Sequence, residues 1–224
     1  MPTPHVHHHD FAAANQALFD QHAHHAEHRP LAPEMAQSVF AAILQAYPFD
    51  REATAVMDYA CGTGIVSRRL AAHCKTLVGV DISQGMVDQF NKGVQSHGIS
   101  SEQMRAVRAE LKGEAGELEG TKFDIVLCSL AYHHFGDIAA TTRLLAFFLK
   151  PGGTLIVVDF PTMDIAAVPA DFVDVIAHKG GIPEAAIKEV YDGAGLGGFR
   201  YVLFKGPKSD MHPEEMFLAS GVKS

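Results

Sequence analysis

Short apolar runs alternate with amphipathic runs from residue 53 to residue 160. The apolar runs are rich in Val, Ile and Leu, as buried strands are, and lie at residues 53–60, 76–82, 104–111, 122–130 and 153–160. Helical spacing of apolar residues is found between them, at residues 64–74, 83–98 and 137–150. Strands joined by helices run parallel, with helices on both faces of the sheet. The alternation therefore predicts an α/β fold with a doubly wound, mostly parallel sheet.

The C-terminal part breaks this alternation. Residues 163–181 have the pattern of a loop with a short helix, residues 183–195 that of a helix, and strand-like runs follow at 199–206 and 215–222. Too few residues separate the last two runs for a crossover helix, so they should pair antiparallel. The predicted sheet thus has seven strands and ends in a C-terminal antiparallel β-hairpin. The "GAGLGG" segment at 193–198 follows a helix and precedes a strand, which predicts a helix stop and turn instead of a phosphate loop.

Composition argues against several classes of protein. The formal net charge is -8, from 18 basic and 26 acidic residues, whereas a protein that grips a phosphate backbone is usually basic, so no nucleic-acid partner is expected. No apolar run approaches the roughly 20 residues of a membrane helix, and the N-terminus lacks a signal-peptide pattern. The three cysteines, Cys61, Cys74 and Cys128, fit neither a disulfide framework nor paired metal-ligand spacing. A reducing, cytoplasmic setting is predicted.

Two further helices are predicted before the alternating region, at residues 11–29 and 35–47. The first contains His24, His25 and His28, whose spacings of three and four would place them on one helix face. The segment has no cysteine and no clear third ligand, so no metal site is expected there.

Small residues follow the first predicted strand, in "VMDYACGTG" at residues 56–64. Gly62 and Gly64 let the backbone turn sharply and approach a ligand closely. Asp81 ends the second predicted strand, where a carboxylate can accept hydrogen bonds from the hydroxyls of a ribose. The third glycine of a dinucleotide fingerprint and the lysine of a P-loop are both missing. Because Asp58 would repel a diphosphate and suit a cationic group, the loop favours S-adenosylmethionine over NAD.

Four segments, "VMDYACGTG", "VGVDIS", "FDIVLCSLAYHHF" and "LKPGGTLIVVDF", together resemble the successive motifs of the class I S-adenosylmethionine-dependent methyltransferases. They are similar to the small-molecule branch, which includes the ubiquinone/menaquinone C-methyltransferases and many fungal and bacterial relatives. The resemblance runs over roughly residues 54–160. It implies a Rossmann-like methyltransferase fold, S-adenosyl-L-methionine as cofactor, S-adenosyl-L-homocysteine as product, and methyl transfer as the reaction.

The resemblance also implies which residues contact the cofactor. These are Phe19, Asp58, Ala60, Cys61, Gly62, Thr63, Gly64, Asp81, Ile82, Met86, Glu110, Leu111, Ser129 and Leu130. Ala60 stands where the family has the first glycine of its glycine-rich motif, and its methyl group is tolerated there if the residue keeps φ below zero.

His133 and His134 match histidines that face the transferring methyl group in the family, as a general base or as positioning residues, and Tyr132 is the candidate for positioning the acceptor. The Asn/Asp-Pro-Pro-Tyr/Phe signature of enzymes that methylate base or glutamine amino groups is absent. A small-molecule acceptor with a hydroxyl, thiol or carbon nucleophile is therefore predicted. The alternative is a catalytically silent methyltransferase-like protein with a binding or regulatory role.

The segment "NQALFDQHA", at residues 15–23, resembles the start of small-molecule relatives in which a mobile helix covers the cofactor. Residues 1–50 are therefore expected to form a helical lid or cap, and residues 51–224 the S-adenosylmethionine-binding methyltransferase domain. Phe19 would then pack near the site, where such a lid excludes water and shapes the acceptor pocket. Otherwise Phe19 is only a core anchor of an amphipathic helix.

Overall fold

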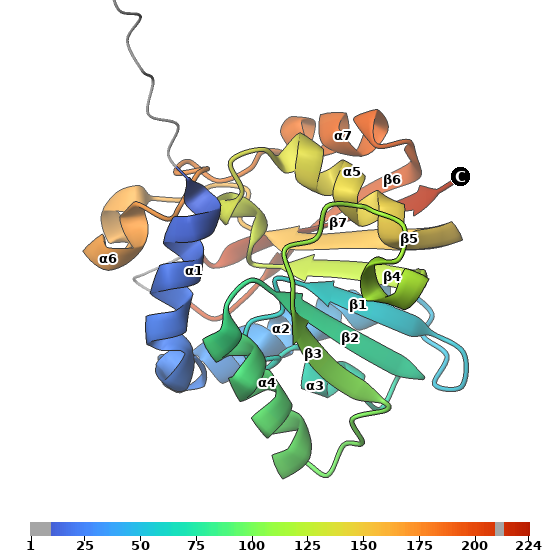
Figure 1. The fold of residues 1–224 in the computed structure, drawn as a ribbon. Helices are drawn as coiled ribbons and strands as arrows, with labels where there is room; N and C mark the ends of the chain where they lie inside the picture. Colours follow the sequence, from blue (N-terminus) through green and yellow to red (C-terminus); the bar gives the residue numbers. More distant parts are fainter. Residues whose placement is uncertain (1–9, 209–212) are drawn as a thin grey trace, which may run out of the picture.

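Seven strands form one sheet in the order β3-β2-β1-β4-β5-β7-β6 (Figure 1). The computed structural model describes residues 10–208 and 213–224. Its strands are β1 (Ala55–Tyr59), β2 (Thr76–Asp81), β3 (Met104–Arg108), β4 (Phe123–Ser129), β5 (Leu149–Asp159), β6 (Leu196–Lys205) and β7 (Glu215–Lys223). Strands β1 to β5 run parallel, and β7 lies antiparallel between β5 and β6. The predicted doubly wound sheet with a C-terminal hairpin is confirmed.

Helices cover both faces of this sheet. The α-helices are α1 (Phe11–His22), α2 (Ala32–Ala46), α3 (Ser67–Leu70), α4 (Gln84–Ser96), α5 (Ile138–Phe148), α6 (Ala170–Val173) and α7 (Glu184–Gly193). Short 3-10 helices are η1 (Ala23–His28), η2 (Glu117–Gly120), η3 (Tyr132–His134) and η4 (Ile165–Ala167). Side chains of α2, α3 and α4 pack on one face, and those of α5 and α7 pack on the other. Figure 1 shows α5 and α7 together over one side of the sheet.

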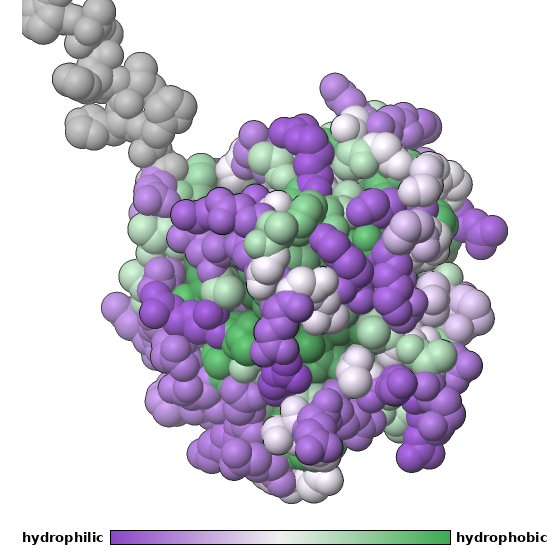
Figure 2. Space-filling model, turned by 45° about the vertical axis from the view of Figure 1, so that its right-hand side comes forward, coloured by the Kyte–Doolittle hydropathy of each residue, from purple (hydrophilic) through white to green (hydrophobic). Residues whose placement is uncertain are grey.

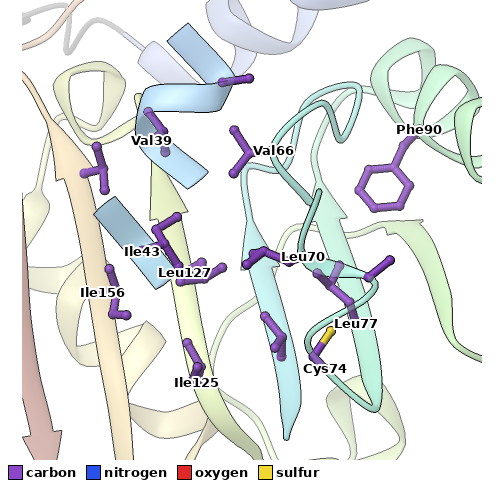
Figure 3. Close-up of a cluster of buried hydrophobic side chains, with 14 of the residues drawn as sticks. Val39, Ile43, Val66, Leu70, Cys74, Leu77, Phe90, Ile125, Leu127 and Ile156 are labelled. Atoms are coloured by element: carbon purple, nitrogen blue, oxygen red, sulfur yellow. The ribbon is translucent and has the colours of Figure 1, made fainter. Parts of the chain in front are cut away.

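The central strands are apolar on both faces. Val56 belongs to the core cluster that contains Ile43 of α2 and Leu70 of α3, whereas its neighbour Met57 belongs to the cluster that contains Leu145 of α5. All five side chains have no exposed surface. Figure 3 shows Ile43 and Leu70 beside labelled side chains of β4 and β5. Burial on both faces explains why the strands appear in the sequence as continuous apolar runs.

The predicted helix at 64–74 is wrong in extent, because α3 has only four residues. The Arg68 N–H bonds to the carbonyl four residues back, as in an α-helix, but the N–H groups of Arg69, Ala71 and His73 bond to carbonyls only three residues back. The guanidinium groups of Arg68 and Arg69 donate to the carbonyl oxygens of Thr63 and Ile65, each at 2.6 Å. Two arginine side chains thus bind carbonyl groups that a continuous helix would use for its own ladder.

Other predicted boundaries hold more closely. The predicted helix at 11–29 is α1 followed by the 3-10 helix η1. Ser83 caps α4, since its Oγ accepts a hydrogen bond from the Met86 N–H at 3.1 Å. The "GAGLGG" segment contains the end of α7 at Gly193 and a turn in which Gly195 has φ 72°. The predicted helix stop and turn is confirmed.

Hydrophilic residues cover much of the face drawn in Figure 2, and hydrophobic residues show between them. Within residues 10–208 and 213–224, none of the helices is both long enough and apolar enough to cross a bilayer.

Candidate functional site

Three carboxylates lie at the carboxyl ends of parallel strands. Asp58 is near the end of β1, Asp81 ends β2 and Asp159 ends β5, and each is at most 9% exposed. The carboxyl ends of parallel strands meet at one edge of the sheet, where ligands bind in open α/β folds. Figure 1 shows α1 standing beside these strand ends. Two cavities lie under α1 at this edge.

The first cavity has a volume of about 520 Å³ and lies between the ends of β1, β2 and β4 and the helix α1. It brings together all but one of the residues that the family resemblance assigned to the cofactor: Phe19, Asp58, Ala60, Cys61, Gly62, Thr63, Asp81, Ile82, Met86, Glu110, Leu111, Ser129 and Leu130. Gly64 is the exception. A Cβ atom at Gly64 would lie 2.4 Å from the Phe90 ring, so this glycine makes room for the packing of α4 beneath the loop.

Both carboxylate oxygens of Asp81 accept hydrogen bonds from backbone N–H groups, one in the glycine loop after β1 and one directly after β2. Oδ2 accepts the Gly62 N–H at 2.9 Å, and Oδ1 accepts the Ser83 N–H at 2.9 Å. Burial raises the pKa of Asp81, and the hydrogen bonds from Ser83 and Gly62 act against that rise. Each carboxylate oxygen retains a second lone pair, so Asp81 can still accept hydrogen bonds from a ligand in the cavity.

Ala60 adopts a left-handed backbone conformation, with φ 56°. The condition under which the Ala60 methyl group would be tolerated, φ below zero, is therefore not met. For a residue with a Cβ atom this conformation costs about 1–2 kcal/mol. Leu130, on the facing loop after β4, has φ 55° and lines the same cavity. Such strained residues tend to cluster at binding sites, where the surrounding structure holds them in place.

Three buried side-chain atoms of the described residues have no hydrogen-bond partner, and all three belong to residues that line the first cavity. They are Oδ1 of Asn15, Nη2 of Arg29 and Oδ1 of Asp58. Buried polar atoms are nearly always paired, so three unpaired ones around one cavity indicate a polar ligand. The set offers two acceptors and one cationic donor.

Asp58 is a buried acceptor near the end of β1, just before the glycine loop. Its Oδ2 accepts a hydrogen bond from the Ser67 hydroxyl, and its Oδ1 has no partner among the described residues. Burial raises the pKa of Asp58 to about 7, the bond from Ser67 opposes the rise, and the charge of Asp81 adds to it. An ammonium group in the cavity would pair with Asp58 and favour its ionised form.

Arg29 supplies the unpaired donor and lies between the two cavities, since it lines both. Its guanidinium carbon lies 4.6 Å from the centre of the Phe172 ring, a cation–π arrangement that holds the side chain in place. Burial lowers the pKa of this guanidinium, which is the expected effect of removing a cation from water.

The second cavity has a volume of about 640 Å³ and shares a wall with the first. The shared residues are Phe19, Ala26, Arg29, Ile65, Val66, Leu130 and His134. None of the described residues that line the second cavity is an aspartate or a glutamate, whereas Asp58, Asp81, Glu110 and Asp137 line the first. The polar side chains of the second cavity are His22, His25, Arg29, His133 and His134. The two adjoining cavities thus differ in charge.

His133 lines the second cavity and is paired with Asp159, which is fully buried. The distance between His133 Nδ1 and Asp159 Oδ1 is 2.8 Å, and the His133 backbone N–H donates to Asp159 Oδ2 at 3.0 Å. Burial would raise the pKa of Asp159, but the imidazole and the N–H groups of His133 and Phe160 hold it below its usual value. An ionised Asp159 accepts from Nδ1–H and leaves Nε2 as the available nitrogen of His133.

His134 lines both cavities and is held as a neutral ring. Its Nδ1 lies 2.9 Å from the Val175 carbonyl oxygen, so Nδ1 carries the proton. Burial and the neighbouring His133 ring, 4.1 Å away between centroids, lower the pKa of His134 to about 3. The Phe19 ring meets His134 edge-on at 5.3 Å. His134 is thus a packed part of the wall.

Tyr132 does not reach either cavity. Its side chain has no exposed surface, and its hydroxyl lies 3.2 Å from the Thr142 Oγ1 of α5. The expected contact between Tyr132 and an acceptor is not supported by this position. Within η3, the Tyr132 side chain points into the core, whereas the side chains of His133 and His134 line the cavities.

Comparison with known proteins agrees with this geometry. The profile of the family described as "Methyltransferase domain" matches residues 56–153. An uncharacterized methyltransferase of Schizosaccharomyces pombe is 36% identical over 149 residues, which cover 63% of this chain and 52% of that protein. A ubiquinone biosynthesis O-methyltransferase of Rhizobium etli is 33% identical over 118 residues, which cover 52% of this chain and 46% of that protein. The chain spans about half the length of these curated relatives.

Residues 56–153 are similar to a methyltransferase domain. The resemblance stated from the sequence motifs is therefore confirmed. Among solved structures, the magnesium protoporphyrin IX methyltransferase of Synechocystis PCC 6803, crystallised with bound S-adenosylmethionine, has a TM-score of 0.68 at 19% identity, over 99% of this chain and 100% of that chain. This likeness shows a shared Rossmann-like methyltransferase fold.

Two acidic residues of the N-terminal helices, Asp20 of α1 and Glu27 of η1, bond to the strand-and-helix part of the fold that follows. Asp20 Oδ1 accepts hydrogen bonds from Ser83 Oγ at 2.6 Å and from the Gly85 N–H at 2.9 Å, at the start of α4. Glu27 of η1 pairs with Arg68 at 2.6 Å. Because Arg68 also donates to the Thr63 carbonyl of the glycine loop, η1 is coupled to the loop that lines the first cavity.

Four residues of the site were not named from the sequence: Asn15, Asp20, Arg29 and Asp159. Asp159 had a signal, since it ends an apolar strand as Asp81 does. Asn15 and Asp20 belong to the "NQALFDQHA" segment that resembles a lid helix. Arg29 had no signal of its own, because its role depends on segments that are distant along the chain.

Proposed function

We propose that this protein is an S-adenosylmethionine-dependent methyltransferase that acts on a small-molecule acceptor. The observation that carries the proposal is that two residues of opposite charge line the first cavity, Asp58 and Arg29, and that each has a buried side-chain atom without a partner among the described residues. An α-amino acid has an ammonium group and a carboxylate side by side, and S-adenosylmethionine ends in one. Asp58 would bind the ammonium group, and Arg29 would bind the carboxylate.

The remaining wall suits the rest of this cofactor. Asp81 would accept hydrogen bonds from the ribose hydroxyls, and Ile82, Met86 and Leu111 would flank the adenine, as in the family that the motifs resemble. The four carboxylates that line the cavity suit a cation and would repel a diphosphate. When bound, S-adenosylmethionine supplies a methyl group already activated on a positively charged sulfur.

The work left to the chain is alignment and exclusion of water. Orientation of two reactants can be worth about 7–11 kcal/mol. We infer that α1, η1 and α2 form the lid or cap over residues 51–224, with Phe19 on the wall between the two cavities. Residues 1–9 of the expected lid lie outside the described residues. A second cavity of about 640 Å³ fits an acceptor of small-molecule size.

Calorimetric titration tests the proposal. S-adenosylmethionine and S-adenosylhomocysteine should bind, and NADH should not. Asp81→Ala should weaken S-adenosylhomocysteine binding about 10- to 100-fold, because hydrogen bonds to a charged acceptor are worth about 1.5–3 kcal/mol. Asp192→Asn is the matched control, since Asp192 is half exposed and pairs only with Lys188 on the surface of α7. Binding of NADH, or unchanged S-adenosylhomocysteine affinity in Asp81→Ala, would overturn the proposal.

A further inference from the structure

We infer that the second cavity holds the methyl acceptor and selects an apolar molecule with a weakly acidic hydroxyl group, such as a phenol or an enol, whose proton passes to His133. This inference rests on the proposed function and specifies its acceptor. It is carried by the lining of the second cavity and by the contact between His133 and Asp159.

The lining favours an apolar acceptor. Most of the wall is aliphatic, aromatic or thioether, with Phe160, Phe172, Met35, Met163 and Ile176 among its side chains. No carboxylate of the described residues lines it, and its one permanent charge is the cation of Arg29. A cationic amine would find no counter-charge there, so the cavity discriminates against cationic acceptors.

His133 has the geometry of an oriented base. Its Nδ1 lies 2.8 Å from Asp159, and its backbone carbonyl accepts the N–H groups of Ala177 and His178 at 2.9 and 3.0 Å. Ring and backbone are thus both fixed. Because the Nδ1 edge faces the buried carboxylate, Nε2 is the nitrogen that a ligand in the second cavity can reach.

His134 cannot serve in the same way. Its Nδ1 bonds to a neutral carbonyl, that of Val175, whereas the Nδ1 of His133 bonds to a carboxylate. The ring is also buried beside His133, where a second positive charge is unfavourable. The structure therefore assigns the base to His133 and a wall position to His134.

The chemistry that needs this pair is methylation of a hydroxyl group. The acceptor oxygen forms a bond to the methyl carbon, the bond from that carbon to sulfur breaks with its electrons remaining on sulfur, and the hydroxyl proton passes to His133 Nε2. The positive charge that began on sulfur ends on the imidazole, beside Asp159. A phenol with a pKa near the value of about 10 for tyrosine needs such a base, whereas a thiol near 8.5 needs it less.

Three probes with one ring system separate the acceptor classes: 1-naphthol, 1-naphthylamine and 1-naphthalenethiol. With S-adenosylmethionine, the wild-type protein should methylate 1-naphthol faster than the other two. His133→Ala should lower kcat for 1-naphthol by about 100-fold or more while S-adenosylhomocysteine affinity stays within twofold. Faster methylation of the amine or the thiol, no methylation of 1-naphthol, or an unchanged kcat in His133→Ala would overturn the inference.

A binding measurement gives a readout independent of turnover. Val168 lines the second cavity but not the first, so Val168→Trp should fill the second cavity and abolish 1-naphthol binding to the S-adenosylhomocysteine complex. Ala166→Trp, at an exposed position two residues away that lines neither cavity, is the matched control. Unchanged 1-naphthol binding in Val168→Trp would contradict the location.

The two proposals fail in different ways. If the wild-type protein does not bind S-adenosylhomocysteine, the proposed function is wrong. If it binds S-adenosylhomocysteine but neither binds nor methylates 1-naphthol, only the acceptor inference is wrong.

Discussion

At the scale of single residues, the account depends on buried polar atoms that the chain itself does not satisfy. An unpaired buried polar atom costs about 1–3 kcal/mol, so proteins hold few of them. Asn15 shows the selectivity of this arrangement, because its amide nitrogen donates to the carbonyls of Phe11 and Val175 while its Oδ1 has no partner. Asn15 lines the first cavity, so its unpaired Oδ1 belongs to the wall of the proposed binding site. The unpaired atoms of the site therefore lower the free energy of unfolding of the unliganded protein, and we expect a bound ligand to offset this cost.

The pH dependence of stability in Asp58→Asn tests whether a buried polar group of the site destabilises the fold. Burial raises the pKa of Asp58 to about 7, so in the unliganded protein its ionised form is disfavoured. The folded protein thus loses stability as pH rises from about 4 to about 7, and the loss is constant above that range. Asparagine carries no charge, so Asp58→Asn should be more stable than wild type at pH 8. The difference in free energy of unfolding between variant and wild type should be larger at pH 8 than at pH 5, by up to about 3 kcal/mol.

Urea unfolding at pH 5 and pH 8 measures this difference, with Asp192→Asn as the exposed control. A variant less stable than wild type at pH 8, or a difference that does not change with pH, would contradict the assignment of a buried, destabilising charge to Asp58.

Ala60 offers a second residue-scale prediction. Its left-handed backbone should be relieved by Ala60→Gly, which we expect to stabilise the fold by about 0.5–1 kcal/mol after the entropy cost of glycine. Ala72→Gly, at an exposed position without positive φ, should be destabilising by a similar amount. Urea midpoints check both, and a loss of stability in Ala60→Gly would show that the conformation is not strained.

Sequence predicted some of these residues and not others for a physical reason. Asp58 and Asp81 follow apolar strands and flank a glycine turn, so local pattern and resemblance both mark them. Arg29 and Asp159 act through contacts with Phe172 and His133, which the sequence does not place beside them. Tyr132 was misjudged because its neighbours face the cavities while its own ring turns into the core.

At the scale of elements, the N-terminal helices contact the rest of the fold through the Phe19 ring and through polar bonds. Asp20 binds the first turn of α4, and Glu27 binds Arg68. The sequence predicted the helix but neither bond, because both join segments more than 40 residues apart. It also predicted too long a helix at α3, since the arginine side chains that occupy the carbonyls of Thr63 and Ile65 leave no periodic signal.

Removing Asp20 should loosen α1. Asp20→Ala deletes the acceptor for Ser83 Oγ and the Gly85 N–H, so amide hydrogen exchange should become faster in α1 and in the first turn of α4. S-adenosylhomocysteine affinity should fall about 10-fold, since the wall that α1 contributes becomes less ordered. Asp88→Ala, an exposed change on α4, is the control, and Asp20→Asn should restore part of the protection. Unchanged exchange in Asp20→Ala would contradict the role of this contact.

At the scale of the whole molecule, the parallel sheet gathers distant residues at one edge and the chain divides that edge into two cavities. The sequence predicted the doubly wound, mostly parallel sheet, because the alternation of apolar and amphipathic runs and the connectivity of the chain determine it. It did not predict the division of charge, in which four carboxylates line the first cavity and none of the described residues that line the second is a carboxylate. That division depends on where α1, η1 and the segment after β5 lie over the sheet.

The most direct test of the central claim compares S-adenosylhomocysteine with 5′-methylthioadenosine, which lacks the amino acid portion, by calorimetry at pH 7.5. Asp58→Asn and Arg29→Gln should each weaken S-adenosylhomocysteine binding about 10- to 100-fold and leave 5′-methylthioadenosine binding nearly unchanged. Arg143→Gln, at an exposed position of α5, should affect neither. If both variants bind S-adenosylhomocysteine as the wild-type protein does, the two unpaired groups do not hold the amino acid end of the cofactor and the account is wrong.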